Sequence, residues 1–84
     1  MPRIDLPHSP HPALLRFSER LRELRSLRGI SQERLAMEAG LARSYVGEVE
    51  RAQRNISLIN ITKLAEALDV EPSRLLESIG SRIF

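Results

Sequence analysis

The 84-residue chain is long enough for one domain, and it has no apolar run near the roughly 20 residues that a membrane-spanning helix requires. The absence of cysteine excludes disulfides and thiolate metal sites, and no signal-peptide-like apolar core is present, so a cytoplasmic protein is expected. The formal net charge is only +2, but every one of the 13 cations except Lys63 is an arginine, whose planar guanidinium suits phosphate oxygens and guanine edges.

Residues 1–12 are predicted to form an extended or disordered arm. They hold all but one of the five prolines, and proline lacks the backbone donor that a helix needs. Both histidines, His8 and His11, also lie there. Two histidines without a third ligand do not make a metal site, so we expect no metal and no cofactor.

The first helix is predicted over residues 13–28, where apolar side chains recur every three or four positions and charged residues fill the other face. Gly29 suits the left-handed residue that ends it. Residues 16–34 hold six arginines against three glutamates, the local basic charge that a phosphate-facing surface needs. The inward residues are expected to be Leu14, Phe17, Leu21 and Leu24, with Leu27 beside them.

Two short helices are expected next, at residues 32–39 and about 42–51, with Ser31 as the N-cap of the first. Because Ala36 is small the two helices can cross closely, and Gly40 permits the sharp turn between them. One apolar face then joins Leu35, Ala39, Leu41, Val46 and Val49. A polar outward face on the second helix can enter a DNA major groove. It is expected to consist of Arg43, Ser44, Gly47 and Glu48.

A fourth helix is predicted after its N-cap Ser57, and a fifth from Pro72 through residue 79, ended by Gly80. The inner face of the fourth helix is expected to be Leu58, Ile61, Leu64, Ala65 and Leu68. Since no segment alternates like a strand, the predicted fold class is all-α. Five helices form one helix-turn-helix domain over residues 13–80, followed by a C-terminal tail at 81–84.

The segment LRELRSLRGISQERLAMEAGLARSYVGEVER and the stretch after it resemble the Cro and phage-repressor type of helix-turn-helix, the xenobiotic-response-element family. The resemblance covers residues 14–79, and its most specific parts are GISQERLA, RSYVGEVER and RNISL. Within the family, ARSYVGEVERAQRNISLINITKLAEAL is most similar to the controller proteins of restriction–modification systems. The resemblance implies a homodimer on a pseudo-palindromic double-stranded DNA operator, acting as repressor or activator by blocking or recruiting RNA polymerase.

The resemblance also implies roles along the recognition helix. Arg43 would read a base edge, and Ser44 would contact a base or a phosphate. Tyr45 would lie along the DNA backbone with its hydroxyl on a phosphate. Glu48 would accept from a cytosine amino group or repel wrong sequences. Gly47 costs about 1 kcal/mol of helix propensity relative to alanine. Two explanations for this glycine are open: it allows a close approach to DNA, or it is simply tolerated in a packed helix.

The flanks of this helix are expected to hold the DNA backbone. Ser31 and Gln32 would bind a phosphate at a helix N-terminus through backbone N–H groups and the side-chain amide. Arg54 and Asn55 would contact the backbone beyond the recognition helix. Many relatives have glycine where Ala52 stands, so this turn is expected to differ slightly.

Two further sets of residues are given structural roles. Arg25 and Glu50 match the family's internal ion pair, which explains an acidic residue on a helix that faces phosphate. The apolar C-terminal end is more than a small monomer covers, so part of it is expected to be a dimer face. The candidate residues are Leu75, Leu76, Ile79 and Ile83.

Other functions stay open at this point. An antitoxin or a phage- or plasmid-type repressor would carry a protein partner on its C-terminal helices. A protein-interaction adaptor would use the helical bundle without DNA. An enzyme is not expected, because the only histidines lie in the arm and no isolated carboxylate pair suggests a catalytic site.

Overall fold

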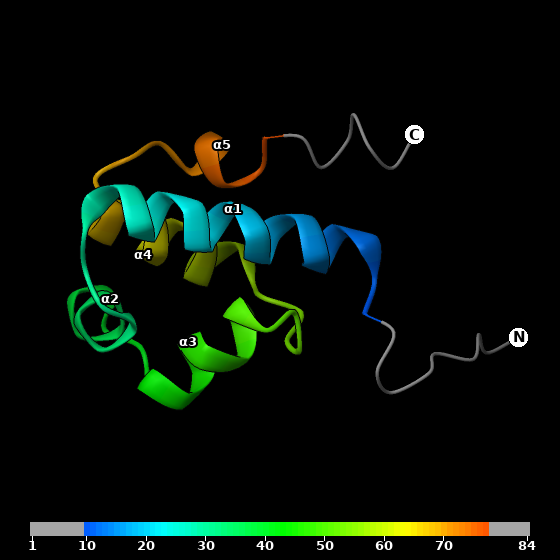
Figure 1. The fold of residues 1–84 in the computed structure, drawn as a ribbon, viewed down its shortest axis with the longest axis horizontal. Coiled ribbons are helices and arrows are strands. Elements are labelled where there is room, and N and C mark those ends of the chain that lie inside the picture. Colours follow the sequence, from blue (N-terminus) through cyan, green and yellow to red (C-terminus); the bar gives the residue numbers. More distant parts are fainter. Residues whose placement is uncertain (1–9, 78–84) are drawn as a thin grey trace, which may run out of the picture.

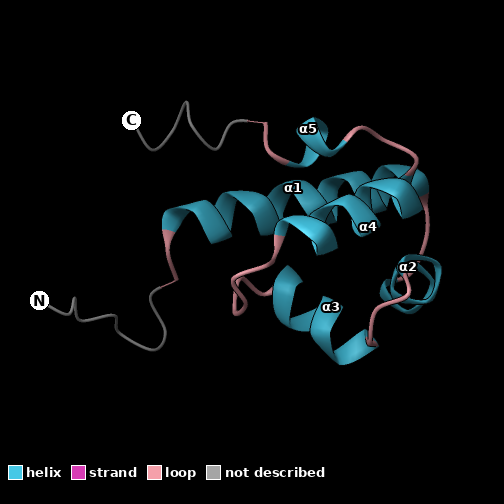
Figure 2. Cartoon of the chain, turned by 180° about the vertical axis from the view of Figure 1, so that it is seen from behind, coloured by secondary structure: helices cyan, strands magenta, loops and turns pink. Residues whose placement is uncertain are grey.

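The computed structural model describes residues 10–77, and within that range the chain forms five helices and no strand. They are α1 (Pro12–Arg28), α2 (Gln32–Ala39), α3 (Arg43–Glu50), α4 (Leu58–Leu68) and α5 (Pro72–Leu75). The long α1 crosses the molecule, with α5 on one side of it and α2 and α3 on the other (Figure 1). The view from behind shows α4 running alongside α1 (Figure 2). The predicted all-α, five-helix fold is therefore confirmed.

The first helix begins one residue earlier than predicted, so the end of the predicted arm is helical. Pro12 occupies the first turn, where its missing N–H leaves no bond unmade. The Nδ1 atom of His11 accepts the N–H of Ala13 at 3.0 Å and caps the helix. Residues 1–9 lie outside the described part of the chain.

The turn between α2 and α3 depends on a left-handed residue. Gly40 has φ +71°, a conformation that costs an L-residue about 1–2 kcal/mol. The N–H of Leu41 then bonds to the carbonyl of Ala36 at 2.9 Å and closes the helix end. At the other end of α2, the Ser31 hydroxyl accepts the Arg34 N–H at 2.9 Å. Both predictions for this segment, the cap and the turn, are confirmed.

One apolar core joins all five helices. Its fully buried members include Leu21 of α1, Leu35 of α2, Val46 of α3 and Leu64 of α4. The remaining buried apolar residues of this core are Phe17, Leu24, Ala36, Ala39, Val49, Ile61, Ala65, Ala67, Leu68 and Leu75. Because α3 contributes valines to a core shared with α1 and α4, its position relative to the rest of the domain is fixed.

Two residues expected to face inward point to solvent instead. Leu27 is 75% exposed, because Arg28 faces α4 and donates from Nη1 to the Ala67 carbonyl at 2.6 Å. Leu58 is 69% exposed at the start of α4. Ile56, the residue before the Ser57 cap, packs against the core in its place.

The last helix is shorter than predicted. α5 ends at Leu75 instead of running to residue 79, and the Nε of Arg20 donates to the Arg74 carbonyl at 2.8 Å, giving this acceptor a partner outside the helix. Leu75 has no exposed surface, so its assignment to a dimer face is wrong: it fills the monomer core. Residues 78–84, which include Gly80 and the predicted tail, lie outside the described part of the chain.

Candidate nucleic-acid interface

The outward surface of α3 starts directly after the turn at Gly40. Arg43 and Ser44 in its first turn are both exposed, and the Arg43 side chain keeps 64% of its accessible surface. Glu48 follows Ser44 by four residues and lies on the same face. Arg43 and Ser44, two of the residues predicted to contact bases, therefore lie on a helix surface that the core does not cover.

The Arg43 guanidinium has one weak neighbour in the free protein. Its Nε lies 4.0 Å from Oε2 of Glu33, and both side chains are well exposed. An exposed pair of this kind contributes about 0–1 kcal/mol and does not fix a long side chain. The contact leaves Arg43 able to turn toward a base edge.

A buried carboxylate attaches α3 to α1 and α2. Glu50 is 2% exposed, and its two oxygens accept from Nε and Nη2 of Arg25 at 2.7 and 3.0 Å. Gln32 adds a third donor at 2.9 Å, and the Arg22 guanidinium bonds to the Glu50 carbonyl. The remaining Nη1 of Arg25 reaches the Ile30 carbonyl at 3.0 Å. The two residues expected to form the internal ion pair thus meet in a bidentate contact that joins α3 to α1.

The same network changes the expected role of Gln32. Its amide Nε2 donates to Glu50, so in the free protein this side chain makes an internal hydrogen bond between α2 and α3 and is not available to bind a phosphate. Gly47 is buried, so its predicted outward position is wrong. A Cβ there would lie 3.5 Å from Oε1 of Gln32 and 3.2 Å from Nη1 of Arg51. The close approach at Gly47 is to the protein's own side chains, which cross over it.

A second cluster lies where α3 ends. The Nε of Arg54 donates to Oε1 of Glu48 at 2.7 Å, and its guanidinium carbon lies 5.2 Å from the centre of the Tyr45 ring. The hydrogen bond to Glu48 and its negative charge raise the pKa of Arg54, which therefore stays charged. The Tyr45 hydroxyl accepts from Nδ2 of Asn60 at 3.0 Å, which ties the ring to α4.

The other flanking residues are exposed near the same surface. Ser31 uses its hydroxyl oxygen as the α2 cap, and its hydroxyl hydrogen is not needed for that bond. Asn55 is exposed in the loop between α3 and α4. Ala52 in this loop has φ +60°. The turn therefore has the left-handed conformation that glycine favours, although alanine stands at this position.

Sequence reasoning missed three residues of this region. Arg22 contacts the Glu50 carbonyl, Asn60 holds Tyr45, and Arg51 covers Gly47. Arg22 lies one turn before Arg25, a spacing that could have suggested a shared target. The Asn60 contact spans 15 residues and a loop, so no local pattern indicated it.

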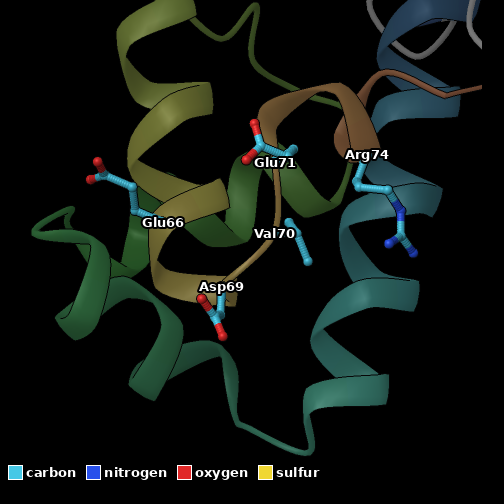
Figure 3. A pocket seen from close by; sticks show the side chains of 5 residues that line it. All are labelled: Glu66, Asp69, Val70, Glu71 and Arg74. Atoms are coloured by element: carbon cyan, nitrogen blue, oxygen red, sulfur yellow. The ribbon is translucent and has the colours of Figure 1, made fainter.

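A shallow depression lies between the end of α4 and α5. It is lined by Glu66, Asp69, Val70, Glu71 and Arg74, whose charged groups point in different directions instead of converging (Figure 3). Three carboxylates against one guanidinium would repel phosphate. This depression is not the nucleic-acid interface.

Residues 10–77 were also compared with the requirements of a metal site and of a membrane-spanning helix, and they meet neither. No group of three or more histidine or acidic side chains is placed to hold a metal ion there. Among the helices of this range, none is both long and apolar enough to cross a membrane.

Comparison with known proteins gives consistent results. The family model for helix-turn-helix domains matches residues 21–75. The control protein C.BamHI of Bacillus amyloliquefaciens is 45% identical over 64 residues, which cover 75% of this chain and 79% of that protein.

Two solved structures share the fold. The restriction–modification controller protein C.AhdI from Aeromonas hydrophila aligns with a TM-score of 0.76 and 62% identity, covering 77% of this chain and 98% of that one. The hypothetical transcription factor NHTF from Neisseria aligns with a TM-score of 0.77 and 36% identity, covering 99% and 94% of the two chains.

Proposed function

This chain belongs to the helix-turn-helix family, and from that premise we propose that it is a sequence-specific DNA-binding regulator of transcription. It acts as a homodimer on a pseudo-palindromic operator, and its role is that of a controller protein of a restriction–modification system. The similarity to C.BamHI and C.AhdI supports this assignment. No enzymatic activity is part of the proposal, and the protein works in the cytoplasm.

The observation that carries the proposal is the surface at the start of α3. Arg43 and Ser44 are exposed on a helix that Glu50 and two valines hold against the rest of the domain. A rigidly held helix with a polar outer face fits the major groove. Within it, Arg43 reads a guanine through its two-pronged guanidinium, and Ser44 contacts a base or a phosphate.

Phosphate contacts on either side of the groove orient the protein. The N-terminus of α2 offers backbone N–H groups at Ser31 and Gln32. The Tyr45 hydroxyl, which accepts from Asn60, can still donate its own hydrogen to a phosphate. Arg54 and Asn55 supply the contacts beyond α3, and such contacts give the binding its salt dependence.

The dimer brings two copies of α3 to one face of the DNA. Of the residues expected at its interface, Leu76 is exposed at 41%, while Ile79 and Ile83 lie outside the described residues. Leu58 and Ile59 add an exposed apolar pair at the start of α4. The occupied operator blocks or recruits RNA polymerase, so repression and activation are both possible outcomes of one binding event.

The test is a comparison of two duplexes. The first is the sequence most enriched by the wild-type protein from a random library, and the second is the same sequence shuffled. We expect the enriched duplex to bind at least about a thousandfold more tightly at physiological salt. Equal affinity for the two would contradict the proposal and would leave a non-specific binder or an adaptor.

A further inference from the structure

Glu48 is the acidic residue on the outward face of α3, and one oxygen of its carboxylate already has a partner. Oε1 accepts from Nε of Arg54 at 2.7 Å, a short charge-assisted bond across the loop that follows the helix. Both side chains remain partly exposed, at 38% for Glu48 and 53% for Arg54. A cytosine amino group approaching this carboxylate would meet a group that is already bonded to a guanidinium.

The Arg54 guanidinium is held from a second side. It lies over the Tyr45 ring at 5.2 Å from its centre, within the range of a cation–π contact. The ring is fixed in turn by the bond from Asn60 to the Tyr45 hydroxyl. Glu48 sets one edge of the guanidinium and Tyr45 one face, which together define the plane of the group.

This arrangement leaves the outer edge of Arg54 available. Within the described residues, its hydrogen bond to protein uses Nε, and neither Nη atom has a hydrogen-bond partner there. The pair of Nη groups is the edge that can bind two oxygens of one phosphate. Arg54 lies just past the end of α3, and Arg43 lies at the start, so the two arginines mark opposite ends of the recognition surface.

We infer that Glu48 is a positioning residue for Arg54 and not a reader of bases. It holds Arg54 over Tyr45, so that the Nη edge meets a backbone phosphate flanking the half-site. The inference rests on the proposed DNA-binding function, and it gives the acidic side chain on the outward face of α3 the task of positioning the arginine that binds phosphate.

The expected effect of replacing Glu48 on DNA affinity is opposite to the effect expected from its charge alone. Removing a negative charge beside DNA should tighten binding if Glu48 does nothing else. If it positions Arg54, Glu48→Ala weakens binding instead, and only while Arg54 is present. A double-mutant cycle measures this dependence directly.

The experiment uses Glu48→Ala, Arg54→Ala and the double variant on the duplex most enriched by the wild-type protein. Arg54→Ala should weaken binding about tenfold, as expected for a bond between charged groups, and reduce the salt slope by about 0.9. Glu48→Ala should also weaken binding and reduce the salt slope. In the Arg54→Ala background it should have no weakening effect, and the bases selected from a random library should stay unchanged.

Three results would overturn the inference. They are tighter binding by Glu48→Ala in the wild-type background, an equal loss in both backgrounds, or relaxed selection at one base position. Arg74→Ala is the control, because Arg74 is an exposed arginine on α5, on the far side of α1 from α3 (Figure 1). Melting of each variant shows that it is folded. If the wild-type protein selects no sequence at all, the proposed function has failed, whereas zero coupling with normal wild-type selection refutes this inference alone.

Discussion

Individual side chains at the α3 surface divide into those that hold the helix and those that face outward. Glu50 is buried with three side-chain donors around it, whereas Arg43 is exposed with one neighbour at 4.0 Å. The two residues are seven apart in sequence, yet substitution should affect different properties. Stability depends on Glu50, and recognition depends on Arg43.

Replacing Glu50 by alanine should destabilise the domain by about 3 kcal/mol, the lower end of the range for breaking a buried pair. The lower end applies because Arg25 is 23% exposed and keeps the Ile30 carbonyl as an acceptor. Chemical denaturation of both proteins measures the difference. Glu19→Ala is the control, since the Glu19 side chain is 56% exposed and its pair with Arg16 should contribute less than about 1 kcal/mol. Unchanged melting of Glu50→Ala would show that the network does not hold α3.

Replacing Arg43 by alanine should leave the melting temperature within experimental error and weaken specific binding by about 1–3 kcal/mol. It should also relax base selection at one position of each half-site, because a guanidinium that reads a guanine edge is lost. Selection from a random library, run beside the wild-type protein, reports both effects. A normal base preference in this variant would remove Arg43 from the reading surface.

The left-handed residue at the end of α4 allows a test of how backbone strain affects stability. Asp69 ends α4 with φ +60°, a conformation that costs a non-glycine residue about 1–2 kcal/mol, with aspartate at the lower end, and its carboxylate opposes the helix dipole. Asp69→Gly removes both costs but adds about 0.4–1 kcal/mol of chain entropy in the unfolded state. The expected net gain is about 1 kcal/mol, seen as a rise in melting temperature.

Ala52 provides the matched comparison for that prediction. It has the same φ of +60°, but it is 5% exposed, so Ala52→Gly also loses a buried methyl worth about 0.8 kcal/mol. We expect almost no change in stability. No gain at Asp69 together with a clear loss at Ala52 would mean that backbone strain does not limit the stability of these turns.

At the scale of elements, local signals predicted most of the fold. Serine caps, the glycine at the α2–α3 turn and apolar periodicity placed α2, α3 and α4 to within about a residue. The end of α5 could not be predicted, because Arg20 contacts its last turn from 54 residues away. The same distinction between local signals and contacts of distant segments applies to the candidate site. The exposure of Arg43 follows from helix periodicity, whereas the contacts of Gln32 and Arg54 depend on how separate segments pack.

At the scale of the whole molecule, recognition of a pseudo-palindromic operator requires a dimer. A short chain buries a modest fraction of its surface, and two recognition helices must lie about 34 Å apart to meet successive major grooves. Leu76→Asp should therefore shift the protein toward monomer in sedimentation at micromolar concentration. Leu27→Asp, at an exposed apolar position outside the predicted dimer face, should remain dimeric. A wild-type monomer under these conditions would count against the assembly.

Selection of duplexes from a random library by the wild-type protein is the decisive experiment for operator recognition, because it reports binding, symmetry and spacing together. We expect enrichment of two related half-sites in inverted order, with centres about 10 base pairs apart. Enrichment of no sequence, or of a single unpaired motif at moderate salt, would contradict recognition of an operator by a dimer.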